Sequence, residues 1–279
     1  MPEHRVTVEP FFLPASDGGQ RFCLLRAPDT SPIGAVLFVH AWCEEMNKAR
    51  RMVTLQAQQL AESGFAVLQL DLAGCGDSSG DFSEASWIGW VGDVKHGAQW
   101  LSSRFRSPLW IWGLRSGCLL ASAAVDELEQ EAGLLFWQPV TSGATHLQQF
   151  LRLKLAGQAL DGKSGAKVDD FKQALRAGES VEVAGYELSP ALALGLERAR
   201  LTPTARPTHV VWIEVVPDSE TSISAASEAA LARWQEAGHS VSASVVSGPG
   251  FWRTTEIEDA PALLAATTSA VQSLRAASK

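Results

Sequence analysis

The 279-residue sequence is poor in basic residues, and its charge excludes several classes of partner. Its 23 lysines and arginines are outnumbered by 31 aspartates and glutamates, which gives a net charge of −8. Nucleic acid and anionic membranes both bind a basic face, so we expect neither as a partner. No apolar run reaches the roughly 18 residues of a membrane span. The residues after Met1 lack the apolar segment of a secretory signal, so the expected location is the cytoplasm.

The sequence also lacks the cysteine patterns of disulfide frameworks and metal sites. No C-x-x-C spacing occurs, and no cysteine–histidine cluster has the spacing of zinc ligands. The cysteines are Cys23, Cys43, Cys75 and Cys118. We therefore expect free thiols in a reducing compartment, with no metal and no cofactor.

Short apolar runs alternate with helical patterns over most of the chain. An antiparallel hairpin is predicted from residues 6–12 and 21–26, and further strands are predicted at 35–39, 66–70, 109–112, 134–137, 209–216 and 241–246. Such alternation is typical of α/β proteins. The sequence predicts a mostly parallel eight-stranded sheet with helices on both faces.

Residues 141–206 interrupt the alternation. They contain helical patterns at 147–160, 168–175 and 190–201, with glycine-rich joints and no strong strand between them. We predict a core formed by residues 1–140 and 207–279, with residues 141–206 inserted as a helical lid. A longer ordinary crossover between two strands is the alternative.

The most informative motif is Gly113-Leu114-Arg115-Ser116-Gly117, between a predicted strand and a predicted helix. A glycine on each side of such a junction is the frame of a nucleophile elbow, G-x-nucleophile-x-G. In that frame the nucleophile position holds Arg115, and Ser116 comes one place later. A guanidinium stays protonated and has no nucleophilic lone pair, so Arg115 can only bind or stabilise negative charge.

For the other two members of a catalytic triad, the sequence offers one candidate acid and no histidine at the expected position. Asp218 follows the seventh predicted strand, where the acid is expected, although an aspartate there is also a common loop or capping residue. The loop 247–253 after the last strand, where the histidine is expected, contains none. The histidines elsewhere, including His146, have no predicted catalytic role. The sequence therefore predicts that both nucleophile and general base are missing.

Four motifs carry a resemblance to a known family: His40-Ala-Trp42 with Glu44, Glu45 and Asn47, then residues 71–78, 112–115 and 183–190. With them the chain resembles the α/β-hydrolase fold along nearly its whole length. It resembles most closely the exosortase A system-associated hydrolase 2 family. This resemblance implies a cytoplasmic protein linked to exopolysaccharide production and protein sorting in Gram-negative bacteria, with a protein partner in an export or polysaccharide system.

A ligand pocket is expected at the carboxyl ends of the parallel strands. We predict that it is lined by one cation, possible carboxylate partners and aromatic rings, namely His40, Trp42, Glu44, Arg115, Trp137, Asp218, Phe251 and Trp252. Arg115 either forms an ion pair with Glu44 or Asp218, or binds an anion.

Three functions remain open at this point. The first is a non-catalytic protein that binds an acyl, anionic or glycan-like small molecule. The second is an ester or thioester hydrolase or acyltransferase that uses Ser116 or a cysteine with Asp218. The third is a structural partner in an export complex, whose pocket is filled by its own side chains.

Overall fold

The molecule is built on one large sheet, seen in a computed structural model that describes residues 4–160 and 165–277. The sheet has eight strands in the order β1-β2-β4-β3-β5-β6-β9-β10. Strand β2 is antiparallel to both its neighbours, and all the other pairs are parallel. The strands are β1 (Val6–Pro14), β2 (Gln20–Pro28), β3 (Gly34–Val39), β4 (Phe65–Leu70), β5 (Leu109–Leu114), β6 (Ala132–Trp137), β9 (His209–Val216) and β10 (Ser240–Ser247). The predicted eight-stranded, mostly parallel sheet is confirmed.

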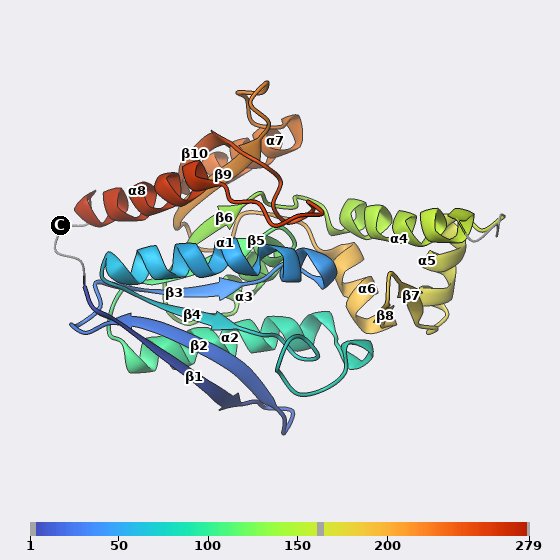
Figure 1. The fold of residues 1–279 in the computed structure, drawn as a ribbon, viewed down its shortest axis with the longest axis horizontal. Helices are drawn as coiled ribbons and strands as arrows, with labels where there is room; N and C mark the ends of the chain where they lie inside the picture. The colour runs from blue at the N-terminus through green and yellow to red at the C-terminus, as the bar shows by residue number, and fades with distance from the viewer. Residues whose placement is uncertain (1–3, 161–164, 278–279) are drawn as a thin grey trace.

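Helices cover both faces of this sheet (Figure 1). One face carries α1 (Cys43–Glu62) and α8 (Pro261–Ala277), and the other carries α2 (Trp87–Arg104), α3 (Gly117–Asp126) and α7 (Ala225–Glu236). Every residue of β3 and β5 is buried, as expected for central strands that are covered on both sides. Within the described parts of the chain, no helix is long and apolar enough to cross a membrane.

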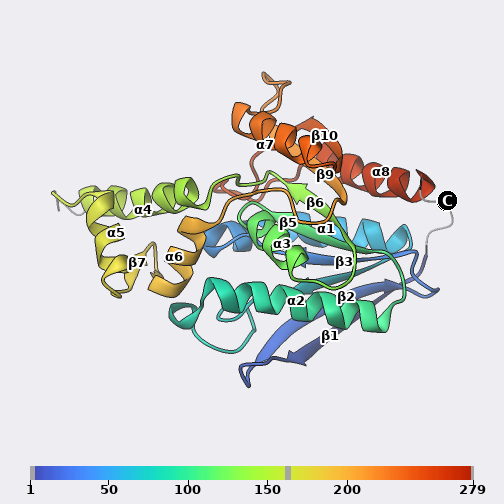
Figure 2. The ribbon, with the colours of Figure 1, turned by 180° about the vertical axis from the view of Figure 1, so that it is seen from behind.

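The insert, as residues 141–206 are called here, projects beyond the end of the sheet in its described parts, 141–160 and 165–206 (Figures 1 and 2). The insert contains α4 (Gly143–Leu160), α5 (Val168–Arg176), β7 (Val181–Val183), β8 (Tyr186–Leu188) and α6 (Pro190–Arg198). The helices were predicted from the sequence, but the β7–β8 hairpin was not. Its two-residue turn has positive φ at Ala184 (50°) and Gly185 (83°), the geometry of a type I′ turn. An Ala-Gly pair is a weaker signal for that turn than Asn-Gly, which is why the hairpin was missed.

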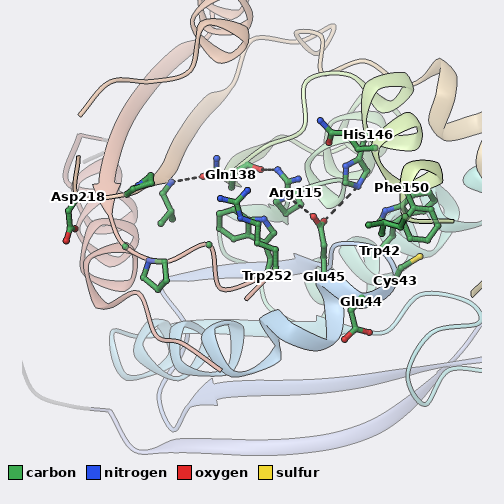
Figure 3. Close-up of a pocket in the computed structure, with 18 residues that line it drawn as sticks. Trp42, Cys43, Glu44, Glu45, Arg115, Gln138, His146, Phe150, Asp218 and Trp252 are labelled. Atoms are coloured by element: carbon green, nitrogen blue, oxygen red, sulfur yellow. Dashed lines mark hydrogen bonds and ion pairs between the residues drawn. The ribbon is translucent and has the colours of Figure 1, made fainter. Parts of the chain in front are cut away.

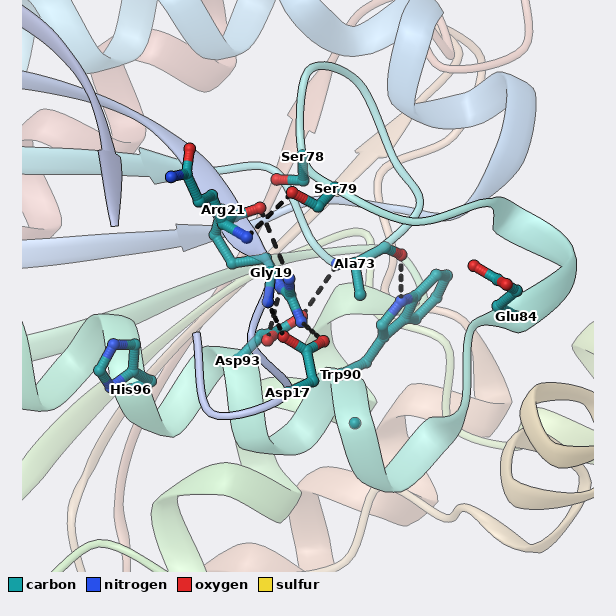
Figure 4. A network of polar contacts seen from close by, with 12 residues as sticks. Asp17, Gly19, Arg21, Ala73, Ser78, Ser79, Glu84, Trp90, Asp93 and His96 are labelled. Atoms are coloured by element: carbon teal, nitrogen blue, oxygen red, sulfur yellow. Dashed lines mark hydrogen bonds and ion pairs between the residues drawn. The ribbon is translucent and has the colours of Figure 1, made fainter. Parts of the chain in front are cut away.

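The β1–β2 hairpin is fixed to the rest of the core by a buried polar network (Figure 4). Arg21 of β2 is paired with Asp17 and, at 2.8 Å from Nε to Oδ1, with Asp93 of α2. Asp93 also accepts a hydrogen bond from the Ala73 N–H at 2.9 Å, and the Trp90 indole donates to the Ala73 carbonyl at 2.9 Å. The network ties the hairpin, the loop after β4 and helix α2 together on the side of the molecule that carries β1.

Candidate functional site

The turn between β5 and α3 is centred on Arg115. Arg115 has φ of 54°, in the left-handed region, whereas Ser116 has an ordinary helical φ of −63°. A Cβ on Gly113 would lie 2.6 Å from Cys118 Cα, and one on Gly117 would lie 2.3 Å from the Val39 carbonyl oxygen. Both glycines are therefore required by the close approach of backbone to backbone. The structure places Arg115, not Ser116, at the sharp turn where a nucleophile would stand.

Ser116 is buried and is already hydrogen-bonded within the protein. Its side chain is 3% exposed, and its hydroxyl oxygen accepts a hydrogen bond from the Trp42 N–H at 3.2 Å. The Trp42 N–H comes from the loop after β3, which supplies an oxyanion-hole donor in this type of site. The Ser116 oxygen therefore points toward the loop after β3 and accepts the hydrogen bond that the Trp42 N–H donates.

Three groups hold the Arg115 guanidinium (Figure 3). Arg115 Nε donates to Glu45 Oε1 at 3.1 Å, Nη1 donates to the Gln138 carbonyl at 3.4 Å, and the guanidinium carbon lies 5.4 Å from the centre of the Trp252 ring. The last contact is a cation–π interaction. Trp252 stands in the loop after β10, where the histidine of a triad was sought.

The carboxylate partner of Arg115 is Glu45, so the predicted partners Glu44 and Asp218 were wrong. Helix α1 begins at Cys43, and this sets which glutamate faces inward. The exposed Glu44 instead accepts a hydrogen bond from the Tyr186 hydroxyl of the insert at 3.3 Å. Asp218 accepts a hydrogen bond from the Ser247 hydroxyl.

His146, which sequence reasoning left without a role, lies beside this ion pair. Its Nε2 is 3.9 Å from Glu45 Oε2, too long for a direct hydrogen bond. Burial, reinforced by the charge of Arg115, lowers the pKa of His146 to about 3, so the ring is neutral at physiological pH. Burial raises the pKa of Glu45 above its ordinary value, against the opposing effect of Arg115.

A sequence signal for His146 existed in the spacing of helix α4. His146 and Phe150 are four residues apart and therefore share one face of the helix. Their rings lie 5.6 Å and 4.7 Å, respectively, from the ring of Trp42. A histidine on the aromatic face of an inserted helix was thus a candidate for the site.

These groups line a pocket of about 820 Å³. Its walls come from the loops after β3, β5, β6, β9 and β10, from the start of α1 and from helix α4 of the insert. Its volume falls in the range of small-molecule sites. Among the predicted residues it brings together Trp42, Glu44, Arg115, Asp218 and Trp252, and it adds others that were not predicted, including Glu45, Gln138, His146, Phe150 and Arg253. Asp218 and His146 lie at opposite sides of it (Figure 3).

The structure places three predicted pocket residues behind the lining. Trp137 is fully buried, and its indole donates to the Thr267 hydroxyl at 2.8 Å, on the side of the sheet that α8 covers. Phe251 packs edge-on between Trp137 and Trp252. The His40 ring lies within hydrogen-bond distance of the Ala41 carbonyl (2.6 Å) and accepts from the Leu72 N–H (3.2 Å), so it ties the loops after β3 and β4 together.

The cysteine thiols are buried and unreactive, and the described residues offer no metal site. All four thiols are free and buried. Burial raises the pKa of Cys75 to about 12 and raises that of Cys43, which lines the pocket, further still. A thiol in that state is not a nucleophile at neutral pH. Over residues 4–160 and 165–277, no group of three histidine, cysteine or carboxylate side chains could hold a metal ion.

Comparison with known proteins identifies the fold. No family model and no curated sequence matches this chain. Among solved structures, it is similar to the esterase Est1E of Butyrivibrio proteoclasticus with ferulic acid bound (TM-score 0.65, 15% identity, 95% of this chain and 97% of that chain covered). The fold is the α/β-hydrolase fold.

Two further α/β-hydrolase structures match over nearly the whole chain. A thermostable carboxyl esterase of Bacillus coagulans in complex with glycerol has a TM-score of 0.65 at 14% identity, with 96% and 99% of the two chains covered. A serine hydrolase without lid from Xanthomonas campestris has a TM-score of 0.58 at 15% identity, with 98% of each chain covered. At such identities the likeness concerns the fold.

Proposed function

We propose that this protein is a non-hydrolytic member of the α/β-hydrolase fold that binds a small molecule in the pocket around Arg115. The insert serves as the helical lid of that pocket, with residues 1–140 and 207–279 as the core. The observation that carries the proposal is Arg115 at the sharp turn after β5, held in an ion pair with Glu45. A fixed positive charge stands where this fold would need an activated nucleophile.

The neighbouring groups support the same conclusion. Serine catalysis requires a base hydrogen-bonded to the hydroxyl, with an acid that orients the base. Ser116 is bonded to the Trp42 N–H, and neither ring nitrogen of His146 has a hydrogen-bond partner among the residues that the structure describes. The pocket keeps its volume and its aromatic walls, which favours binding over a filled, purely structural core.

The cellular setting is part of this proposal and rests on the resemblance of the sequence motifs. We place the protein in the cytoplasm, in an exosortase-linked or exopolysaccharide system, with a protein partner in that system. Its ligand would then be an acyl, anionic or glycan-like molecule of that system.

The second candidate function is an ester or thioester hydrolase or acyltransferase. It is favoured by the fold of the esterases that the chain resembles. Its nucleophile would have to be Ser116 or a buried cysteine, with Asp218 as the acid. If Ser116 is the nucleophile, its hydroxyl must exchange the hydrogen bond from the Trp42 N–H for a contact with a base.

Activity-based labelling separates the two functions. The purified protein is treated with a fluorophosphonate probe and, separately, with iodoacetamide, and is assayed with p-nitrophenyl butyrate. A serine esterase of the same fold serves as the positive control. We expect no labelling and no turnover by the folded protein. Labelling that disappears in Ser116→Ala, or turnover that copurifies with the protein, would overturn the proposal.

A further inference from the structure

Three polar atoms in the pocket wall are buried without hydrogen-bond partners among the described residues. They are Glu45 Oε2 and both ring nitrogens of His146. The two side chains come from different parts of the chain, α1 of the core and α4 of the insert, and both line the same cavity. Buried polar groups are almost always paired, and an unpaired one costs free energy. A ligand that completes these bonds is therefore favoured, and because the three atoms expose almost no surface in the unliganded protein, the Glu45 or His146 side chain must shift slightly to admit it.

The spacing of these atoms fits one oxygen atom. Glu45 Oε2 and His146 Nε2 are 3.9 Å apart. For an oxygen at ordinary hydrogen-bond distance from both atoms, the angle Oε2–oxygen–Nε2 would be about 90°, close to the geometry of a hydroxyl. A hydroxyl donates one hydrogen bond and accepts others, so it can donate to the carboxylate oxygen and accept from the imidazole N–H.

Charge in the pocket disfavours ionic ligands at this position. The charge of Arg115 opposes protonation of His146, and the same field opposes a bound ammonium group beside that ring. A bound carboxylate would face Glu45 Oε2, which offers no hydrogen when ionised. A fatty acyl chain would leave all three atoms unpaired. A neutral hydroxyl is the group that satisfies Glu45 Oε2 and His146 Nε2 together.

Aromatic rings flank this polar pair. The ring of Trp42 lies 5.6 Å from His146 and 4.7 Å from Phe150, and Trp252 lies under Arg115 on the other side. Rings of this kind bury the apolar C–H faces of a ligand. The pocket therefore combines a hydroxyl position with apolar walls, the two surfaces that a sugar or a cyclic polyol presents.

We infer that the pocket binds a neutral polyhydroxylated molecule, a sugar or a polyol, through a hydroxyl that bridges Glu45 Oε2 and His146 Nε2. The inference rests on the proposed function, because it assigns the ligand class of that same pocket. It makes His146 and Glu45 recognition residues and gives the insert a direct part in binding.

Ligand-observed NMR on the full-length protein tests the inference. The probes are glycerol, myo-inositol and the methyl glycosides of glucose, galactose, mannose and rhamnose, compared with octanoate and with 1,5-diaminopentane. At least one neutral hydroxylated probe should bind, and its Kd should rise about tenfold or more in Glu45→Gln and in His146→Phe. The matched controls Glu129→Gln and His209→Phe change exposed residues outside the pocket lining and should leave the Kd unchanged.

A second measurement keeps the test decisive where a variant is unstable. His146→Phe removes two unpaired buried nitrogens, so the melting temperature of the unliganded protein should rise by about 2 °C or more. A histidine with a purely structural role would give a lower melting temperature. The combination of weaker binding and higher stability is expected only for a ligand-recognition residue.

The alternative outcomes distinguish the two proposals. Binding of octanoate or the diamine, with no hydroxylated probe bound, overturns the hydroxyl assignment and leaves a non-hydrolytic binding protein. Absence of binding by every probe, or a fall in melting temperature in His146→Phe, also overturns the assignment. Labelling of Ser116 by the fluorophosphonate overturns the proposed function itself, whichever probe binds.

Discussion

Arg115 lies at a position with two energetic costs, one for its backbone conformation and one for its positive charge. Its backbone is in the left-handed region, and it precedes α3, whose N-terminus carries a positive partial charge. The Glu45 carboxylate at 3.1 Å offsets the dipole, and the face of Trp252 adds a cation–π contact. At the scale of single residues, the site is an ion pair that stabilises a strained turn.

Removing the arginine should expose how much of the stability depends on this pair. Arg115→Met leaves Glu45 mostly buried without its counter-charge, and we expect a loss of about 3 kcal/mol in the free energy of unfolding. The double variant Arg115→Met/Glu45→Met should regain most of the loss. Urea unfolding of both variants and the wild type measures this. A double variant no more stable than Arg115→Met would contradict the account.

The same variant should depend on pH in a defined direction. In Arg115→Met the lowering effect of the guanidinium is gone, so burial raises the pKa of Glu45 further above its ordinary value of 4.5. A carboxyl with a raised folded-state pKa favours folding when protonated, and this contribution is lost as the pH rises through that pKa. The destabilisation by Arg115→Met should therefore be larger at pH 8 than at pH 5. Urea unfolding at the two pH values checks it.

The turn between β5 and α3 gives a prediction at the scale of elements. Arg115→Gly and Arg115→Ala both remove the ion pair, but only alanine keeps a Cβ at φ of 54°. Glycine adopts that conformation without steric cost. Arg115→Gly should therefore be about 1 kcal/mol more stable than Arg115→Ala, measured by thermal or urea unfolding. Equal stabilities would mean that the turn relaxes when the side chain is lost.

The docking of the insert depends on the cap of helix α6. The Ser189 hydroxyl accepts from the Leu192 N–H at 3.0 Å and donates to the Ala85 carbonyl, which precedes α2. Ser189→Ala should lower the free energy of unfolding by about 1–2 kcal/mol and loosen the insert. Hydrogen exchange of the α4 and α6 amides measures that loosening.

A serine cap outside the insert provides the control for this prediction. Ser224 caps α7 by accepting from the Ser227 N–H at 3.4 Å. Ser224→Ala should leave exchange in residues 143–198 unchanged. Faster exchange there in both variants would show that the insert unfolds with the whole core, not on its own.

The elements themselves were largely predictable from the sequence, and the site was less so. The strands follow from continuous apolar runs, and the elbow follows from Gly113 and Gly117. The choice between Glu44 and Glu45 could not be made, because successive helical residues point about 100° apart and the sequence did not show how α1 is oriented on the sheet. His146 was missed because its contacts depend on how α4 of the insert packs against Trp42 and Glu45 of the core.

At the scale of the whole molecule, the candidate site is where the core and the insert meet. Helix α1 supplies Glu45 and α4 supplies His146, while the loops after β5 and β10 supply Arg115 and Trp252. The two apolar layers on either face of the sheet hold these loops in place. Burial on this scale also controls the thiols, since the cysteines lie at 0–6% exposure.

The thiols should therefore react only through large-scale unfolding of the protein. With the pKa of Cys23 and Cys75 raised to about 12 and those of Cys43 and Cys118 raised as well, native thiolates are scarce, and burial blocks access. Ellman's reagent should find no reactive thiol at pH 8 in the native protein and four in guanidinium chloride. Slow modification should proceed at one common rate, set by unfolding. Cys43 is the one cysteine that lines the pocket. Its fast, selective modification in the native state would contradict this account and would support the second candidate function, with a cysteine as the nucleophile.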